Sequence, residues 1–443
     1  MDKIYSFAHL TIIAAAGTDS SYGLPGVGDG RRRRRRPRQD KIILGEVALV
    51  QIFPHVSHTL SQSRWATRGW TYQEGYLSRR RLIFTDDQVA YLCNTMHCLE
   101  TIKKPMALKR TEIRTANDSF LKFIPSEPSF RLRNLHLWEE FKEKHIVGFT
   151  MRDLTQASDS INAILGIFRS LEGSGILHFH GIPLRYKTDR RRGRILACAL
   201  GWHHEAVGNE RRGQFPSWSW AGWKGDVRIN EPDVLVPEDC LVAFLDDVTG
   251  RLTYLEDWFE SAVTGSSTEI LDNDAVSTPA PVLRITGPTF RVKFQSPCLS
   301  SSNRSLSQMS ELAGMSFLEG PHAVLHITEE IISLTYAYLD EAITSPAEDE
   351  NDIIALILRP KIPIGATSLT ALLLKPAVEG SSRYRRVGIL RIRHGSKSRP
   401  TGYLAPQTVY INLDGSVLDE VDMDMREVPI WQRDIAVRTV EIV

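Results

Sequence analysis

Gln73 and Glu74 stand at the centre of the stretch RWATRGWTYQEGYLSRRR, where aromatic and basic side chains surround one amide and one carboxylate. If residues 65–77 form one helix, its aromatic side chains fall on two faces, Trp65 on one and Trp70 on the other. A helix with two apolar faces packs between layers, so Glu74 would be at least partly buried. Burial raises the pKa of an unpaired carboxyl, which makes Glu74 the candidate catalytic residue.

Two structural roles compete with catalysis for Glu74. The segment Thr71–Glu74 matches a capping box, in which the carboxylate would accept a hydrogen bond from a backbone N–H. Alternatively, the carboxylate forms an ion pair with an arginine that is close in sequence; the candidates are Arg68, Arg79, Arg80 and Arg81. Structural networks also recruit carboxylates, and the structural roles are the favoured interpretation.

Histidine and cysteine side chains form no metal site that the sequence identifies. His178 and His180 would point the same way along a strand, but a third ligand at a recognisable spacing is missing. Cys93, His97 and Cys98 lack the spacing of a zinc site. A phosphate-binding glycine loop and a nucleophile elbow are also missing. The sequence therefore predicts neither a metal nor a cofactor.

The segment FPSWSWAGWKG concentrates indole rings; its distinctive residues are Pro216, Trp218, Trp220 and Trp223. These rings could stack on a sugar or a base, but a buried core is the commoner fate of such a cluster. The proline favours a rigid connector that docks against helices. We expect Trp218 and Trp220 to be buried against helices around Phe141 and Ile164.

The elements that position these residues alternate in type through the first half of the chain. Strands are expected at 10–16 and within 41–53, helical structure at 56–77, and a β-hairpin from the runs 80–84 and 89–93. Helical periodicity continues through 135–169, with Ser158 or Asp159 as a cap, and again at 194–202.

Beyond residue 229 the pattern changes to short β-rich runs, as in a sandwich or an antiparallel sheet. These runs are VLRITG, TFRVKF, AVLHI, ISLTYAYL, IIALILRP, LTALLLKP, YRRVGILRI and TVYINL. The polar segments 264–281 and 296–310 are typical of long, mobile loops. The fold class that follows is α+β.

Composition limits the classes of partner. The chain has 443 residues, enough for two or three domains, and its net charge of +1 argues against DNA or an anionic membrane as a global partner. The run Arg31–Arg36 has no interleaved aromatic residues, so a solvated segment is favoured over nucleic-acid binding. Five cysteines, an odd number, fit a reducing intracellular compartment, and the predicted location is the cytoplasm.

The first residues, MDKIYSFAHLTIIAAAG, have some features of a secretory signal. Asp2, Ser6 and His9 interrupt the apolar stretch, so we expect a helix, a strand and a loop instead. No apolar run is long enough to span a bilayer.

The chain resembles the fungal heterokaryon incompatibility (HET) domain family. The stretch SRWATRGWTYQEGYLSRRRLIFTDDQVAYLC is similar to the C-terminal signature of that domain, and MDKIYSFAHLTIIAAAGTDSSYGLPGV to its helix, strand and loop. RDLTQASDSINAILGIFRSL, FHGIPL and RRGQFPSWSWAGWKG resemble the helical extension that follows. The signature residues carried over are Trp65, Arg68, Gly69, Trp70, Gln73, Arg79, Pro216, Trp218, Trp220 and Trp223.

The resemblance implies a protein of fungal nonself recognition and programmed cell death, with protein partners in that pathway. It implies a partial α/β HET module at 1–100 that is similar to Toll/interleukin-1 receptor domains. A helical extension at 101–228 and a β-rich domain at 229–443 would follow. The first functional hypothesis is a signalling or interaction module; the second is an NAD-cleaving effector that uses Glu74, with Trp70 or Tyr72 lining its pocket.

The family places the strand at 10–16 inside its sheet, and we therefore expect an internal, apolar strand. The first half of the family's pattern has no counterpart before Met1, so the expected module is truncated and its sheet is left with an unpaired edge. On this basis the chain alone is expected to show no NAD hydrolysis.

Overall fold

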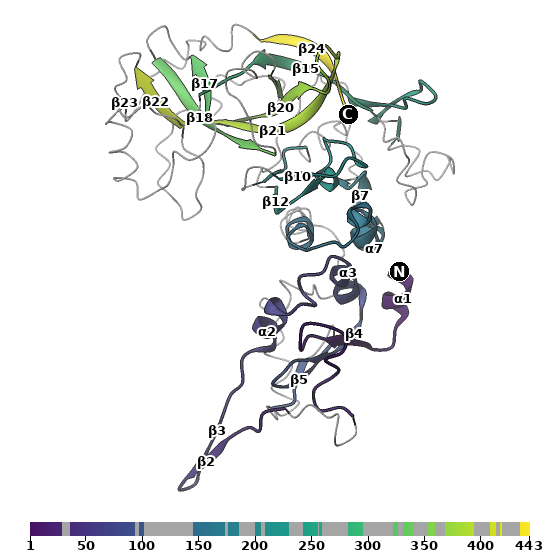
Figure 1. Cartoon of the computed structure of the whole chain (residues 1–443), viewed down its shortest axis with the longest axis vertical. Coiled ribbons are helices and arrows are strands. Elements are labelled where there is room, and N and C mark those ends of the chain that lie inside the picture. Colours follow the sequence, from purple (N-terminus) through teal and green to yellow (C-terminus); the bar gives the residue numbers. More distant parts are fainter. Residues whose placement is uncertain are drawn as a thin grey trace. The chain divides into compact units, whose positions relative to one another are not determined.

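The computed structural model divides into two compact units, Met1–Leu177 and His178–Val443 (Figure 1). The residues described are 1–28, 36–93, 97–101, 145–172, 176–185, 200–204, 209–229, 242–255, 257–258, 282–295, 322–326, 331–340, 353–358, 368–393, 408–412, 417–418 and 435–443. Helices and strands both contribute, which confirms the α+β class. The three domains predicted at 1–100, 101–228 and 229–443 stay a prediction.

The N-terminal unit contains a four-stranded sheet with the order β1-β4-β5-β6. The strands are β1 (Thr11–Ala14), β4 (Arg80–Phe84), β5 (Val89–Cys93) and β6 (His97–Leu99). β1 runs parallel to β4, and the other pairs are antiparallel. The predicted hairpin is therefore confirmed as β4–β5.

The strand β1 corrects the expectation of an internal strand. Among the described residues it pairs with β4 alone and lies at the edge of the sheet. Ile13 is buried against the helices, whereas Ile12 on the opposite face is 55% exposed. One face of the strand packs and the other does not, because successive side chains of a strand point to opposite sides.

The helical elements of this unit are short. They are α1 (Asp2–Phe7), α2 (Val56–Gln62), α3 (Trp70–Leu77), α6 (Val147–Thr150), η2 (Ala157–Ser160) and α7 (Asn162–Glu172). A second hairpin, β2 (Lys41–Leu44) with β3 (Val47–Val50), confirms strand structure within 41–53.

The helical structure expected at 56–77 is found as α2 and α3, but the single helix assumed over 65–77 begins only at Trp70, because residues 63–69 form turns and bends. Ser63 follows α2, and its Oγ accepts a hydrogen bond from the Ala66 N–H at 3.2 Å. Thr71 Oγ1 donates to the carbonyls of Trp65 and Arg68, at 2.5 and 2.6 Å. These local side-chain bonds satisfy backbone groups outside a helix and so favour the break.

The capping-box expectation is also wrong. Gly69 is the N-cap of α3 and Thr71 lies inside the helix, so Glu74 is not at the position of a capping carboxylate. The cap predicted at Ser158 or Asp159 fails as well, because both residues belong to η2 and α7 begins at Asn162. Of the helical stretch expected at 135–169, residues 135–144 lie outside the described part of the chain.

Two hydrophobic layers form the core of the N-terminal unit. Ile13, Ile83 and Leu92 of the sheet pack with Val56 and Leu60 of α2. On α7 every residue from Ala163 to Phe168 is buried, including Gly166, which marks this helix as a central element of the unit.

The C-terminal unit is built mainly from antiparallel strands, as predicted. Its small pairs join β7 (Ile176–Phe179) to β8 (Ile182–Arg185), β9 (His203–His204) to β12 (Val227–Arg228), and β10 (Glu210–Arg211) to β11 (Trp223–Lys224). The tryptophan segment contains η3 (Trp220–Gly222). The helix expected at 194–202 falls largely outside the described residues, and its last positions form a turn.

A twelve-stranded sheet follows. Its strands are β13 (Val242–Leu245), β14 (Leu252–Tyr254), β15 (Val282–Arg291), β16 (Lys293–Gln295), β17 (His322–His326), β18 (Ile331–Leu339), β19 (Ile354–Ile357), β20 (Ser368–Pro376), β21 (Arg383–Arg393), β22 (Thr408–Asn412), β23 (Val417–Leu418) and β24 (Ala436–Ile442). Each predicted β-rich run overlaps at least one of these strands; VLRITG lies on β15, and TFRVKF spans the end of β15 and the start of β16. The segments predicted to be mobile loops, 264–281 and 296–310, lie outside the described residues, as do Arg31 to Arg35.

Part of this sheet closes on itself. The pairing runs β15-β19-β20-β21-β24 and returns to β15, with a parallel contact between β21 and β24. Closure removes free edges and encloses a core that includes Phe290, Leu373 and Leu390. Within the described residues, no helix is long and apolar enough to cross a membrane.

Candidate functional site

The signature helix α3 packs against α7 through Gln73. The Gln73 side chain is buried, and its Oε1 accepts a hydrogen bond from the Gly166 N–H at 3.3 Å. A Cβ at Gly166 would lie 2.6 Å from that oxygen and 2.9 Å from Leu77 Cδ1. The close approach of the two helices therefore depends on glycine at 166, and Gln73 serves packing.

Arg152, which the sequence analysis did not single out, organises the start of α3. Its buried guanidinium donates to the carbonyl of Arg68 at 3.3 Å and to Thr71 Oγ1 at 3.1 Å. The charge also lies 4.7 Å from the centre of the Tyr72 ring. Burial lowers the pKa of Arg152 to about 10. No local pattern predicts this role, because Arg152 and α3 are some eighty positions apart in the chain.

Two aromatic side chains of α3, Tyr72 and Tyr76, face the segment that precedes α6. The Tyr72 hydroxyl lies 3.0 Å from Nδ1 of the buried His145, and burial raises the pKa of Tyr72 above its usual value. Tyr76 meets the His145 ring edge-on, with centres 4.8 Å apart. Both tyrosines contact the segment that leads into α6; Tyr72 is buried and Tyr76 is partly buried.

Glu74 lies on the side of α3 that faces α1. Its carboxylate is half-buried and hydrogen-bonded to the Tyr5 hydroxyl of α1. Burial, together with this carboxylate, raises the pKa of Tyr5 to about 12. The partner of Glu74 is thus a phenol from another helix.

The arginines expected to form an ion pair with Glu74 are exposed or make other contacts. Arg79 and Arg80 are exposed. Arg81 is buried and its Nε donates to the Gly75 carbonyl at 2.7 Å, which satisfies an unpaired backbone group at the end of α3. Arg68 lies at the start of α3, in a surface cavity.

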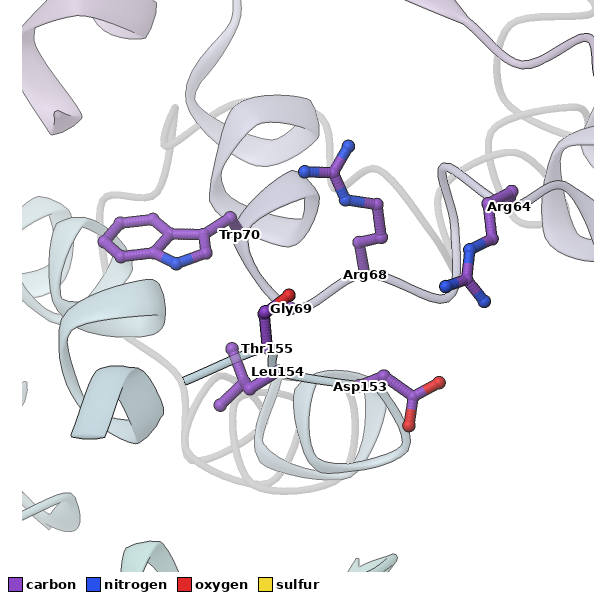
Figure 2. A pocket seen from close by; sticks show the side chains of 7 residues that line it. All are labelled: Arg64, Arg68, Gly69, Trp70, Asp153, Leu154 and Thr155. Atoms are coloured by element: carbon purple, nitrogen blue, oxygen red, sulfur yellow. The ribbon is translucent and has the colours of Figure 1, made fainter. Parts of the chain in front are cut away.

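That cavity has a volume of about 260 Å³ and lies at the N-terminus of α3 (Figure 2). Its lining residues are Arg64, Arg68, Gly69, Trp70, Asp153, Leu154 and Thr155. Figure 2 shows the Trp70 ring and the Arg68 side chain on opposite sides of Gly69. Glu74 is not among the lining residues.

Backbone contacts fix the floor of the cavity. The Gly69 N–H donates to the Asp153 carbonyl at 2.7 Å, and the Asp153 N–H donates to the Thr67 carbonyl at 2.7 Å. A Cβ at Gly69 would lie 2.4 Å from Leu154 Cδ2, so glycine allows this close approach. The Trp70 indole N–H donates to Asp159 Oδ2 at 2.9 Å, which holds the ring at the rim.

The charges at the rim are available to a ligand. Arg64, Arg68 and Asp153 are exposed. Among the residues that the structure describes, neither arginine has a carboxylate within ion-pair distance. Two guanidinium groups and a half-buried indole ring could bind a ligand that joins an anionic group to a planar ring. Of the predicted signature residues, Arg68, Gly69 and Trp70 meet here, whereas Trp65, Gln73 and Arg79 do not.

The tryptophan cluster is core, as predicted. Trp218, Trp220 and Trp223 are each at most 2% exposed. The indole N–H groups of Trp220 and Trp223 donate to the carbonyls of Gly181 and Ser217, at 2.6 and 2.9 Å. A stacking platform would require exposed rings.

The contacts seen for this cluster lie within the C-terminal unit, and its packing against helices around Phe141 and Ile164 stays a prediction. Trp218 stacks on Phe179 with ring centres 5.9 Å apart. Pro216, two residues before Trp218 in the sequence, is also buried. The predicted contact with Phe141 falls outside the described residues. The cluster therefore belongs to the core of the C-terminal unit.

The histidine pair expected along one strand is not formed. His178 lies on β7, whereas His180 has a φ of 47° in the turn that follows. Cys93 and Cys98 are not joined in a disulfide. Within the described part of the chain, no group of three histidine, cysteine or acidic side chains could hold a metal ion.

Comparison with known families gives one match. Residues 1–74 match the family described as heterokaryon incompatibility protein (HET). The matched segment begins at α1 and ends at Glu74 inside α3, so it contains the cavity residues Arg64 to Trp70. The resemblance seen in the residues is confirmed for this segment. Neither the curated proteins nor the solved structures give a match.

Proposed function

We propose that the heterokaryon incompatibility domain at the N-terminus acts as a signalling or interaction module in fungal nonself recognition and programmed cell death. The observation that supports this function is the match of residues 1–74 to the HET family. The signature side chains support a structural use of the motif, because Tyr72 and Gln73 are buried and Glu74 bonds to Tyr5. A cytoplasmic location and protein partners belong to the same proposal.

The test is genetic, in a fungus that carries this chain. Deleting the coding sequence is expected to raise the survival of cells after incompatible fusion. Returning the wild-type or the Glu74→Gln sequence should restore death, because the amide keeps the shape of the side chain and can still bond to Tyr5. Returning Arg152→Met should restore less death, because the fold around α3 is destabilised. Unchanged death after deletion would contradict the proposal.

A second candidate function is cleavage of NAD by Glu74, in a module similar to Toll/interleukin-1 receptor domains. The observation that favours it is the cavity, where two arginines could hold phosphate groups beside Trp70. Glu74 lies one helical turn further along α3, outside the lining residues, and would have to be brought to the ligand. The parallel pairing of β1 with β4 supports the α/β character of such a module.

Purified protein separates the two functions. An interaction module leaves NAD intact at micromolar protein, and this is the result we expect. Turnover that disappears in Glu74→Gln, at an unchanged thermal midpoint, would establish the catalytic function instead. Arg79→Gln is the matched control, since Arg79 is exposed and lies outside the cavity.

A further inference from the structure

The cavity at the start of α3 carries positive charge that the fold itself does not use. Within the described part of the chain, neither the Arg64 nor the Arg68 guanidinium forms a hydrogen bond or an ion pair. Arg81 and Arg152 differ, because both are buried and donate to backbone carbonyls. The two arginines of the cavity are therefore available to an anion, whereas these two structural arginines are not.

An aromatic ring lies beside these charges. Trp70 is half-buried, and its bond to Asp159 holds the ring in one orientation. Across the view of Figure 2, the Trp70 ring lies at one end of the lining, Arg64 lies at the other, and Arg68 lies between them. A ligand that contacts both the ring and the charges has an anionic group next to a flat apolar one.

The volume of the cavity limits the ligand to about the size of one side chain. Pockets that enclose a drug-sized molecule measure roughly 300–1,000 Å³, whereas this surface cavity has about 260 Å³. A whole dinucleotide exceeds that space. A single aromatic side chain fits it, because the chain that carries the side chain can continue outside the cavity.

The charge at the rim selects the kind of anion. A carboxylate carries one negative charge, which a single guanidinium can match in a two-bond pair. A phosphate monoester carries a charge of about −1.5 to −2 near pH 7 and presents three acceptor oxygens. Two unused guanidinium groups at one cavity therefore suit a phosphate monoester better than a carboxylate.

Asp153 distinguishes a peptide from a free anion. Its carboxylate is exposed at the same rim, where it repels a small phosphate ion. A peptide brings backbone N–H groups, and such a donor beside the phosphorylated side chain gives this carboxylate a partner. The rim thus offers acceptor and donor groups together, and an extended peptide can satisfy both.

We propose that the cavity binds a phosphotyrosine side chain of a partner protein. Arg64 and Arg68 hold the phosphate, and Trp70 contacts the ring. The Asp153 carboxylate accepts a backbone N–H of the same peptide. The proposal rests on the interaction function proposed above and names the chemistry of the partner. One anchored side chain gives a dissociation constant on the order of 100 µM.

The test is fluorescence polarisation of a labelled peptide of about nine residues, with phosphotyrosine at its centre and glycine and serine elsewhere. The full chain is titrated to about 0.5 mM, and the unphosphorylated peptide should bind at least about tenfold more weakly. Phenyl phosphate and AMP serve as unlabelled competitors. Both should compete more weakly than the unlabelled phosphopeptide, because neither brings a backbone N–H to Asp153.

Two variants remove the charges one at a time. Arg64→Met and Arg68→Met should each weaken binding of the phosphopeptide at least about tenfold, because each loses a charged donor to the phosphate. The matched control is Arg79→Met, which removes an exposed arginine outside the cavity and should bind within about twofold of the wild type. Equal circular dichroism spectra show that all three variants fold.

Four results overturn the proposal. They are no binding of the phosphopeptide at the highest concentration, equal binding of the unphosphorylated peptide, tighter competition by AMP, and equal weakening by all three variants. None of these contradicts the proposed function, because death after incompatible fusion is scored in cells without any peptide. Unchanged death after deletion of the coding sequence contradicts the proposed function, whatever the purified chain binds.

Discussion

Arg152 is the residue on which the signature segment most depends. Its guanidinium bonds to the carbonyls of Gly148 and Arg68 and to Thr71 Oγ1. Replacing it with Met removes a buried charged donor and leaves these acceptors without it. We expect Arg152→Met to lower the free energy of unfolding by about 3 kcal/mol, measured by denaturant titration.

The control for that experiment is Arg79→Met, which removes an exposed arginine from the same segment. Its cost should stay within about 0.5 kcal/mol. If both variants lose the same small amount, Arg152 is not the organising contact of α3.

Histidines in the C-terminal unit predict sensitivity to acid. Burial lowers the pKa of His180 to about 4, and burial together with Arg391 lowers the pKa of His203 well below its usual 6.5. A folded-state pKa below the unfolded value means that the unfolded chain binds the proton first. The stability contributed by neutral His180 is complete above about pH 6.5 and is lost as pH falls to about 4.

His180→Asn should reduce the loss of unfolding free energy between pH 7 and pH 4 by about 2 kcal/mol, because asparagine does not titrate. Asparagine also tolerates the left-handed backbone at this position. Thermal midpoints across that range are the measurement. An unchanged slope would assign the acid sensitivity to other groups, His203 first among them.

At the scale of elements, the contact between α3 and α7 depends on Gly166. A Cβ there would lie 2.6 Å from Gln73 Oε1 and 2.8 Å from the Asp2 Cβ of α1. We expect Gly166→Ala to destabilise the protein by about 1–3 kcal/mol through overpacking, despite the higher helix propensity of alanine. The thermal midpoint is the measurement.

Gly213→Ala is the comparison variant, since nothing lies within 4 Å of a Cβ at that position. It should change stability by no more than about 0.5 kcal/mol. A Gly166→Ala variant that is as stable as the wild type would show that α3 and α7 can separate at little cost.

At the scale of the whole molecule, one buried ion pair joins parts of the C-terminal unit that are distant in sequence. Arg386 of β21 donates from Nε to Asp340 Oδ2 at 2.9 Å, and both side chains are fully buried. Arg386 also donates to the carbonyls of Leu200 and Trp202. These bonds tie residues 200–202 to the large sheet, and the Arg386 N–H donates to Ser217 Oγ of the tryptophan segment at 3.0 Å.

Asp340→Asn should cost about 3–5 kcal/mol, because Arg386 would remain buried without its counter-charge. The pair of Arg383 with Asp247, 2.7 Å apart with side chains 35% and 34% exposed, provides the control. Asp247→Asn should cost less than about 1 kcal/mol in the same unfolding experiment. Equal losses in the two variants would contradict this account of the buried pair.

The sequence by itself determined the local features of this protein. Alternating apolar residues predicted the β4–β5 hairpin and the strands after residue 229. Successive side chains of a strand point to opposite faces, so this two-residue alternation can be read within one short segment. Large side chains predicted the burial of Trp218 and Trp220. The motif WTYQE predicted the HET match, since the identity of those residues needs no coordinates.

Only the tertiary structure decided what these features do. The break between α2 and α3 depends on hydrogen bonds from side chains to backbone groups of the residues between the two helices. The spacing of apolar residues in the sequence does not reveal such bonds. The partner of Glu74 is Tyr5, and the organiser of α3 is Arg152, each brought there by packing between distant segments. The closure of β24 onto β15 and β21 likewise joins strands far apart in the chain. Contacts of this kind arise from the collective burial of apolar surface, which the order of residues along one segment does not encode.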